Sequence, residues 1–99
     1  MQVVYTHCAG LDVHKKTVVA CRNRPKKRGG VEQEVKTFGT TTPDLLELVE
    51  WLKEWGCTHV AMESTGDYWK PIYNLTEGVF EVLLTNAHEV CAGAQNRSE

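Results

Sequence analysis

The sequence predicts an α/β domain in which helices flank a mixed five-stranded sheet. Segments rich in β-branched residues open the chain, and a segment with helical apolar spacing follows them. Apolar strand-like segments then alternate with a second helical segment. The predicted order is therefore strand, strand, strand, helix, strand, helix, strand. The 99 residues give room for one domain with a modest core.

The first three strands are predicted to form an antiparallel meander. Residues 7–13 and 16–22 are strand-like, and only His14 and Lys15 lie between them, so a tight hairpin connects the two. Residues 23–30 combine Pro, a Gly pair and basic side chains, which indicates a loop. Residues 31–38 then offer a third strand with a charged face.

The clearest predicted helix begins at Thr42-Pro43-Asp44. Thr42 is the expected N-cap, proline suits the first helical position, and the carboxylate complements the positive end of the helix dipole. Gly56 fits a left-handed C-terminal cap. Apolar residues at helical spacing form one stripe between these ends: Leu45, Leu48, Val49, Leu52 and Trp55.

A buried-type strand is predicted over residues 58–62, and it ends at Glu63. A second helix is expected to begin near Asp67 or Tyr68, with Pro71 tolerated in its first turn. Residues 79–85 form the last strand, after a helix end at Gly78.

Two strand–helix–strand crossovers imply parallel neighbours, so the sheet is mixed. This element order is that of the RNase H architecture. We expect the domain to cover residues 1–87, and residues 88–99 to form a disordered tail that diverges from it.

The composition fits an ordinary globular protein, with 41% hydrophobic and 24% charged residues. The net charge of −2 gives no overall attraction to nucleic acid, so such binding must come from a local basic patch or from metal ions. No apolar run approaches the roughly 20 residues of a membrane span, and residues 1–8 lack the pattern of a secretory signal. We expect a cytoplasmic protein without membrane contact. The four cysteines show no CxxC pattern, so reduced, mostly buried thiols are expected.

Two carboxylates are the leading candidates for a metal site. Asp12 is expected at the end of the first strand and Glu63 at the end of the fourth. If those strands are parallel neighbours about 4.8 Å apart, both side chains leave the sheet at one edge and can share a divalent cation. Oxygen ligands favour Mg²⁺ or Mn²⁺. The alternative stays open that Asp12 caps a turn and that Glu63 is a solvated strand end.

Four residues near these carboxylates are candidates for phosphate contact. His14 and Lys15 follow Asp12, and an indirect role for His14 is favoured over metal ligation because hard cations prefer oxygen. Ser64 and Thr65 lie before the second helix, where backbone N–H groups can receive a phosphate. Capping of that helix explains them almost equally well.

The concentrated basic run of the chain is Arg22, Arg24, Lys26, Lys27 and Arg28. It is a candidate contact to a nucleic-acid backbone, which would make affinity fall with salt. A solvated hairpin tip explains it equally well. The three tryptophans are interpreted as core or partner-facing residues rather than base-stacking ones: Trp51, Trp55 and Trp69.

Four short sequence motifs resemble those of a known family. They are GLDVHK at residues 10–15, TFGTTT at residues 37–42, AMESTG at residues 61–66 and YWKP at residues 68–71. With this order and spacing the chain resembles, over about residues 7–87, the DEDD transposases of insertion sequences, which are related to the Piv/MooV DNA invertases.

The resemblance implies a RuvC-like domain whose acidic tetrad binds Mg²⁺, with Asp12 as the first acid and Glu63 as the second. Family members act as recombinases on the ends of a mobile element and on target DNA, and many use a guide RNA that the element encodes. The full-length protein is expected to form a homo-oligomer. The family pattern continues with two aspartates and a serine-bearing domain. No Asp follows Asp67, so we expect a truncated copy.

The leading hypothesis is therefore a fragment of a DNA transposase that uses Mg²⁺-dependent phosphoryl transfer. The alternative is a catalytically inactive remnant that only binds nucleic acid or partner subunits. An actin-like ATPase is less favoured, because His14, Lys15 and Lys16 stand where such proteins need small residues against phosphates.

Overall fold

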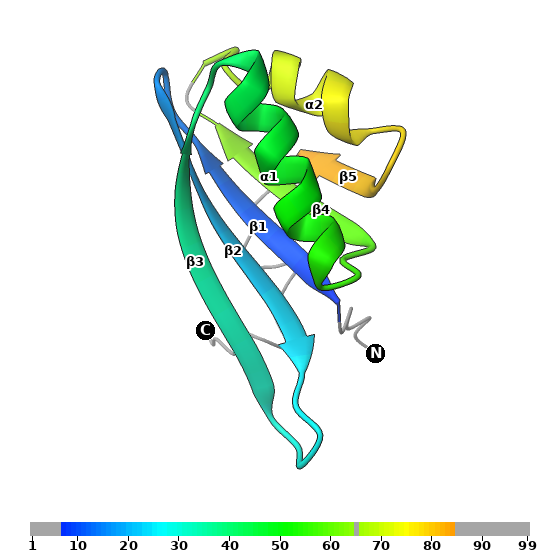
Figure 1. Cartoon of the computed structure of the whole chain (residues 1–99). Helices are drawn as coiled ribbons and strands as arrows, with labels where there is room; N and C mark the ends of the chain where they lie inside the picture. Colours follow the sequence, from blue (N-terminus) through cyan, green and yellow to red (C-terminus); the bar gives the residue numbers. More distant parts are fainter. Residues whose placement is uncertain (1–6, 65, 85–99) are drawn as a thin grey trace.

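A computed structural model of the chain describes residues 7–64 and 66–84, which form one sheet and two helices (Figure 1). The elements follow one another in the predicted order. Their bounds are β1 Cys8–Val13, β2 Thr17–Pro25, β3 Val31–Gly39, α1 Thr42–Glu54, β4 His59–Ser64, α2 Lys70–Thr76 and β5 Glu81–Leu84. None of the helices in these described ranges is long and apolar enough to cross a membrane.

The five strands form a mixed sheet in the order β3-β2-β1-β4-β5. β2 is antiparallel to both β1 and β3, which is the predicted meander. β4 is parallel to β1 on one side and to β5 on the other. The predicted α/β class and the mixed five-stranded sheet are thereby confirmed.

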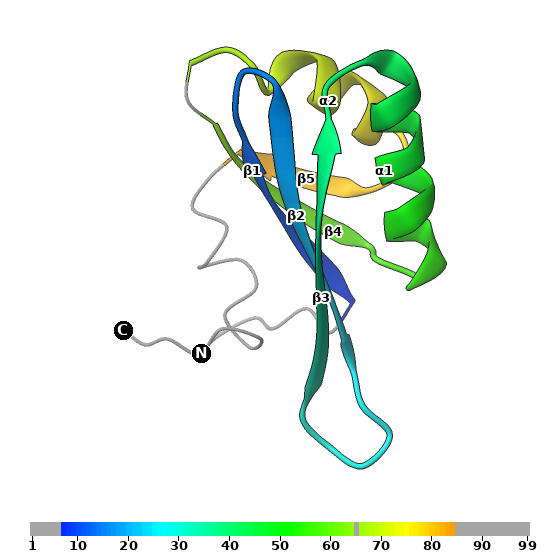
Figure 2. The same ribbon diagram turned by 60° about the vertical axis from the view of Figure 1, so that its left-hand side comes forward.

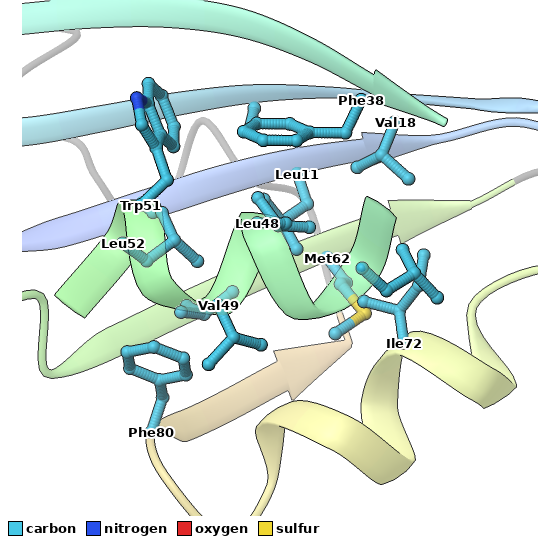
Figure 3. Close-up of a cluster of buried hydrophobic side chains, with 14 of the residues drawn as sticks. Leu11, Val18, Phe38, Leu48, Val49, Trp51, Leu52, Met62, Ile72 and Phe80 are labelled. Carbon is cyan, nitrogen blue, oxygen red and sulfur yellow. The ribbon is translucent and has the colours of Figure 1, made fainter. Parts of the chain in front are cut away.

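Both described helices lie against the same face of the sheet (Figure 2). The core fills the layer between them, where side chains of α1 and α2 meet apolar side chains of β1, β2 and β4 (Figure 3). Residues alternate along each strand, so every second side chain points into this layer. On β1 and β2, the fully buried side chains of this face are those of Ala9, Leu11, Val13, Val18 and Ala20.

Helix α1 begins one residue earlier than expected. Its N-cap is Thr41 instead of Thr42, and the Thr41 hydroxyl accepts a bond from the Asp44 backbone N–H and donates one to the Asp44 carboxylate. The reciprocal pair resembles a capping box, which a cap at Thr42 could not form with Asp44. The carboxylate also lies against Gly39, where any Cβ would clash with it.

The end of α1 agrees with the prediction. Gly56 has a positive φ of 71°, and its N–H donates to the Lys53 carbonyl while the Cys57 N–H donates to the Leu52 carbonyl. This pair of bonds is a Schellman motif, in which glycine is favoured because it adopts the left-handed conformation without strain.

Two strands are longer than the sequence indicated. β2 continues through Asn23 to Pro25, which the sequence analysis assigned to a loop. The loop prediction is wrong there because Asn23 is buried opposite Cys8 and its amide donates to the Cys8 carbonyl. β4 continues past Met62 to Ser64, so Glu63 lies within the strand and not after it.

The three described cysteines are free thiols, as expected. Cys8 and Cys57 are buried and Cys21 is partly buried, whereas Cys91 lies outside the described residues. Burial raises the pKa of the Cys57 thiol to about 11 and also raises the pKa of the Cys21 thiol. Both thiols therefore stay protonated and unreactive near neutral pH.

A buried cation ties β2 to β3 and α1. The Arg22 side chain is only 7% exposed, and its guanidinium lies 4.2 Å from the Trp51 ring centroid and 4.3 Å from that of Trp55. It donates to the Trp51 carbonyl and pairs with Glu34 and Glu54. Burial lowers the pKa of Arg22, but the two carboxylates outweigh this effect and the net pKa is raised.

We predict that Arg22→Ala lowers the free energy of unfolding by about 2–3 kcal/mol, because the substitution removes a desolvated cation with two aromatic and three polar partners. Urea denaturation followed by circular dichroism measures this loss. Arg24→Ala is the control, because Arg24 also lies over the Trp55 ring, at 4.0 Å, and pairs with Glu32 at 3.0 Å, but its side chain is 39% exposed, so solvent screens its charge. It should cost about 1 kcal/mol or less. Equal losses for both variants would contradict the assigned role of Arg22.

Candidate metal centre

Asp12 and Glu63 are direct register partners in the parallel pair β1–β4. Each lies one residue before the end of its strand, so both are at the same edge of the sheet. Paired residues of a sheet point to the same side, so both carboxylates also share a face. Both side chains are exposed, and that of Asp12 is 59% exposed. Water, a phosphate or a cation can therefore reach them.

The hydrophobic pattern fixes this juxtaposition. Leu11 and Met62 are partners in the same register, and both are buried beneath the helices. Because side chains alternate with a period of two, the next residue of each strand must point to the opposite face. A slip of one residue in either strand would expose an apolar side chain, so the core holds Asp12 and Glu63 on the face opposite to the helices.

His14 contacts the first carboxylate. Its Nε2 lies 3.1 Å from the Asp12 Oδ2, and its side chain is 45% exposed. The His14 backbone N–H donates to the Thr17 carbonyl at 2.8 Å, which closes the turn between β1 and β2. The turn therefore holds the imidazole beside Asp12, and Lys15 is an exposed residue of the same turn.

The region after β4 differs from expectation. Ser64 is the last residue of β4, and its hydroxyl donates to the Gly66 carbonyl at 3.4 Å. α2 begins only at Lys70, its N-cap is Trp69, and no side chain caps it. A start near Asp67 or Tyr68, and a capping role for Ser64, are therefore wrong.

The segment before α2 forms a turn instead of a helical start, with the Lys70 N–H donating to the Asp67 carbonyl. Thr65, the other candidate of this segment, lies outside the described residues.

The basic run divides into two groups with different environments. Arg22 is buried and Arg24 is paired with Glu32, so neither is a free surface cation. Lys26, Lys27 and Arg28 are exposed at the β2–β3 tip.

This tip lies at the end of the sheet opposite to the carboxylates, because β2 runs antiparallel to β1 (Figure 1). Six residue steps separate Val19, the partner of Asp12, from Pro25, which is roughly 20 Å at 3.3 Å per residue. The structure therefore does not bring the two groups of candidate residues together.

The donor set at Asp12 and Glu63 fits a hard divalent cation. Mg²⁺ keeps several waters and is commonly held by one or two carboxylates together with substrate phosphates. Within the described ranges, no group of three or more His, Cys, Asp or Glu side chains gathers to hold a metal ion. Within the described residues, Asp12 and Glu63 are the two carboxylates that would hold such a cation.

A hollow beside Glu63 was not anticipated from the sequence. It has a volume of about 290 Å³ and is lined by Met62, Glu63, Ser64, Gly66, Trp69 and Leu84. The only signal in the sequence is the position of an aromatic residue shortly after Glu63, and Trp69 was interpreted there as core or partner-facing. Trp69 does pack partly against the core, as Trp55 does, while Trp51 is buried in it.

We predict that Glu63→Gln raises the free energy of unfolding by up to about 1 kcal/mol at low salt, because like charges on directly opposed residues repel. Urea titrations in 20 mM and 1 M NaCl measure the effect, and the gain should shrink at high salt because salt screens exposed charges. A destabilised variant, or a gain that persists at 1 M NaCl, would show that repulsion from Asp12 is not the cause.

Comparison with known families agrees with this geometry. The family model of DEDD transposases of the IS110 type, described as Transposase, matches residues 9–98 and so covers nearly the whole chain. The match runs into residues 88–99, where the sequence analysis expects a divergent tail. A search of curated proteins finds no match. The chain, with its RNase H-like sheet and its paired carboxylates at the edge, belongs to the IS110-type DEDD transposase family.

Proposed function

We propose that Asp12 and Glu63 hold a divalent cation, Mg²⁺ or Mn²⁺, that serves phosphoryl transfer on DNA during transposition of an insertion sequence. The observation that carries the proposal is the register of β1 and β4, which makes the two carboxylates direct neighbours on one face. Membership of a family of DEDD transposases, which use divalent metal ions, supports the same chemistry.

Each residue of the edge has a distinct part in this proposal. The two carboxylates supply oxygen ligands and, when a cation is bound, it neutralises phosphate charge as a Lewis acid. His14 is a positioning residue, because its contact with the Asp12 Oδ2 orients that carboxylate. Lys15 is exposed in the adjacent turn and can contact a phosphate of the DNA backbone. The remaining acidic ligands of the tetrad come from another segment or from a partner chain.

The β2–β3 tip is proposed as a second contact to nucleic acid. Lys26, Lys27 and Arg28 make no ion pair within the part of the chain that the structure describes. Their charge is therefore available to phosphates. Since roughly 20 Å separates this tip from the carboxylates along β2, the two regions contact separate stretches of nucleic acid, such as two parts of a DNA end or an element-encoded guide RNA. Homo-oligomer assembly and a cytoplasmic location remain predictions.

A second candidate function is an inactive chain that binds nucleic acid or partner subunits. The face of the sheet opposite to the helices favours it. There the register aligns Val35, Cys21, Gly10, Ala61 and Leu83 in one row across all five strands. The two ends of this apolar row are open, with Val35 61% and Leu83 44% exposed. Exposed apolar groups of this kind suit contact with another protein surface. An actin-like ATPase has no such support.

We predict that the chain binds Mn²⁺ and that Asp12→Asn and Glu63→Gln each weaken binding at least about tenfold, because each removes one of two anionic ligands. Isothermal titration calorimetry at fixed ionic strength measures this. Glu77→Gln is the control, because it removes the same charge from an exposed position at the end of α2. Identical isotherms for wild type and for all three variants would remove the metal site from consideration.

We also predict that replacing Lys26, Lys27 and Arg28 together by Gln weakens binding to duplex DNA. The magnitude of the slope of log K against log salt should fall by about 2–3, because each lost phosphate contact reduces it by about 0.9. Fluorescence anisotropy across a salt series measures the slope. Lys53→Gln serves as the control, because Lys53 lies on α1 and pairs with Glu50. An unchanged slope in the triple variant would mean that the tip is only solvated.

A further inference from the structure

The hollow beside Glu63 lies between three parts of the fold. The end of β4 contributes Met62, Glu63 and Ser64, the segment from β4 to the N-cap of α2 contributes Gly66 and Trp69, and the end of β5 contributes Leu84. At about 290 Å³ the hollow is near the lower limit of small-molecule pockets, which run from roughly 300 to 1,000 Å³. It has room for one small planar group and not for a helix or a duplex.

The lining of the hollow combines apolar and polar residues. Trp69 is half-buried, and its ring is held by an edge contact with Tyr73 at a centroid distance of 5.7 Å and an interplanar angle of 86°. Met62 and Leu84 add further apolar surface. Glu63, Ser64 and Gly66 complete the lining and add polar groups to it. Gly66 has a φ of 65°, which lets the chain turn sharply between β4 and Trp69.

This combination fits a nucleobase better than other ligands. A base offers a flat π face for an aromatic ring and a polar edge for backbone and carboxylate groups. Because Glu63 belongs both to the proposed metal centre and to the wall of the hollow, a nucleotide next to a phosphate at the metal centre is within reach of Trp69.

We propose that this hollow binds one unpaired nucleobase of the nucleic-acid strand whose phosphate is held at Asp12 and Glu63, with the base stacked on Trp69. The inference rests on the proposed function for its position in the reaction, but base binding itself needs no metal. In this proposal Trp69 has a different role from Trp51 and Trp55, whose rings pack on the Arg22 guanidinium.

The occupant is an unpaired base because a paired base must first leave its stack. Extruding a base from a duplex costs about as much free energy as stacking it on one aromatic side chain returns. The two terms nearly cancel for a duplex, while a base that is already unpaired gains the full stacking term. The hollow therefore favours single-stranded nucleotides beside the reacting phosphate.

Binding of two single-stranded DNA octamers in EDTA tests the proposal. One octamer carries bases and the other is abasic throughout, so both have the same backbone charge. We expect wild type to bind the base-bearing octamer about tenfold more tightly, Trp69→Leu to lose most of this preference, and Tyr68→Leu to keep it. Tyr68 is the matched control, because it is an adjacent, 42% exposed aromatic residue that does not line the hollow.

A second variant keeps the test decisive if Trp69→Leu fails to fold, which circular dichroism will reveal. Trp69→Phe retains an aromatic ring, so it should keep most of the base preference but lose the tryptophan quenching that the base-bearing octamer causes in wild type. Equal affinity of wild type for the two octamers, or equal quenching in wild type and Trp69→Phe, would overturn the proposal.

The metal proposal is judged separately from the same protein. If wild type does not bind Mn²⁺ but still prefers the base-bearing octamer, the metal proposal is wrong and the base-binding proposal is supported. Normal Mn²⁺ binding without any base preference would do the reverse.

Discussion

The parallel pairing of β1 with β4 is the constraint on which the rest of this domain depends. Leu11 and Met62 both reach the core beneath the helices, and a slip of one residue would turn the apolar side chains of one strand away from it. Asp12 and Glu63 are opposed as a consequence. Like charges on directly opposed residues are unfavourable without a counter-charge, so burial of apolar side chains on one face of the sheet offsets the repulsion of the anionic pair on the other face.

The sheet order separates two tasks along its length. The edge formed by β1 and β4 carries the carboxylates, His14 and the hollow at Trp69, whereas the β2–β3 tip carries exposed cations at the opposite end. Arg22 stiffens the connection between these ends, because it fixes β2 and β3 against α1 through Glu34 and Glu54. A rigid link of this kind would keep the spacing of the two proposed contacts to nucleic acid constant.

The sequence allowed correct prediction of the element order and of the edge shared by the two acids, because both follow from periodicity and strand ends. It misled where tertiary contacts decide the outcome. Arg22 looked like part of a surface basic run, yet it is buried and its guanidinium lies over the rings of Trp51 and Trp55. Thr41, and not Thr42, caps the helix because its hydroxyl donates to the Asp44 carboxylate. Trp69 gave no sign of a hollow, because its walls come from three separate segments.

The distance in sequence between the paired carboxylates has a consequence for how the domain forms. Asp12 and Glu63 are about 50 residues apart, and a parallel pair cannot close through a short turn. The loop-closure entropy of this contact must be met before β1 and β4 gain any stabilisation from each other, which makes their meeting a late and slow event in folding. A nascent or partly unfolded chain then lacks the paired carboxylates, so the proposed cation site would form only together with the global fold.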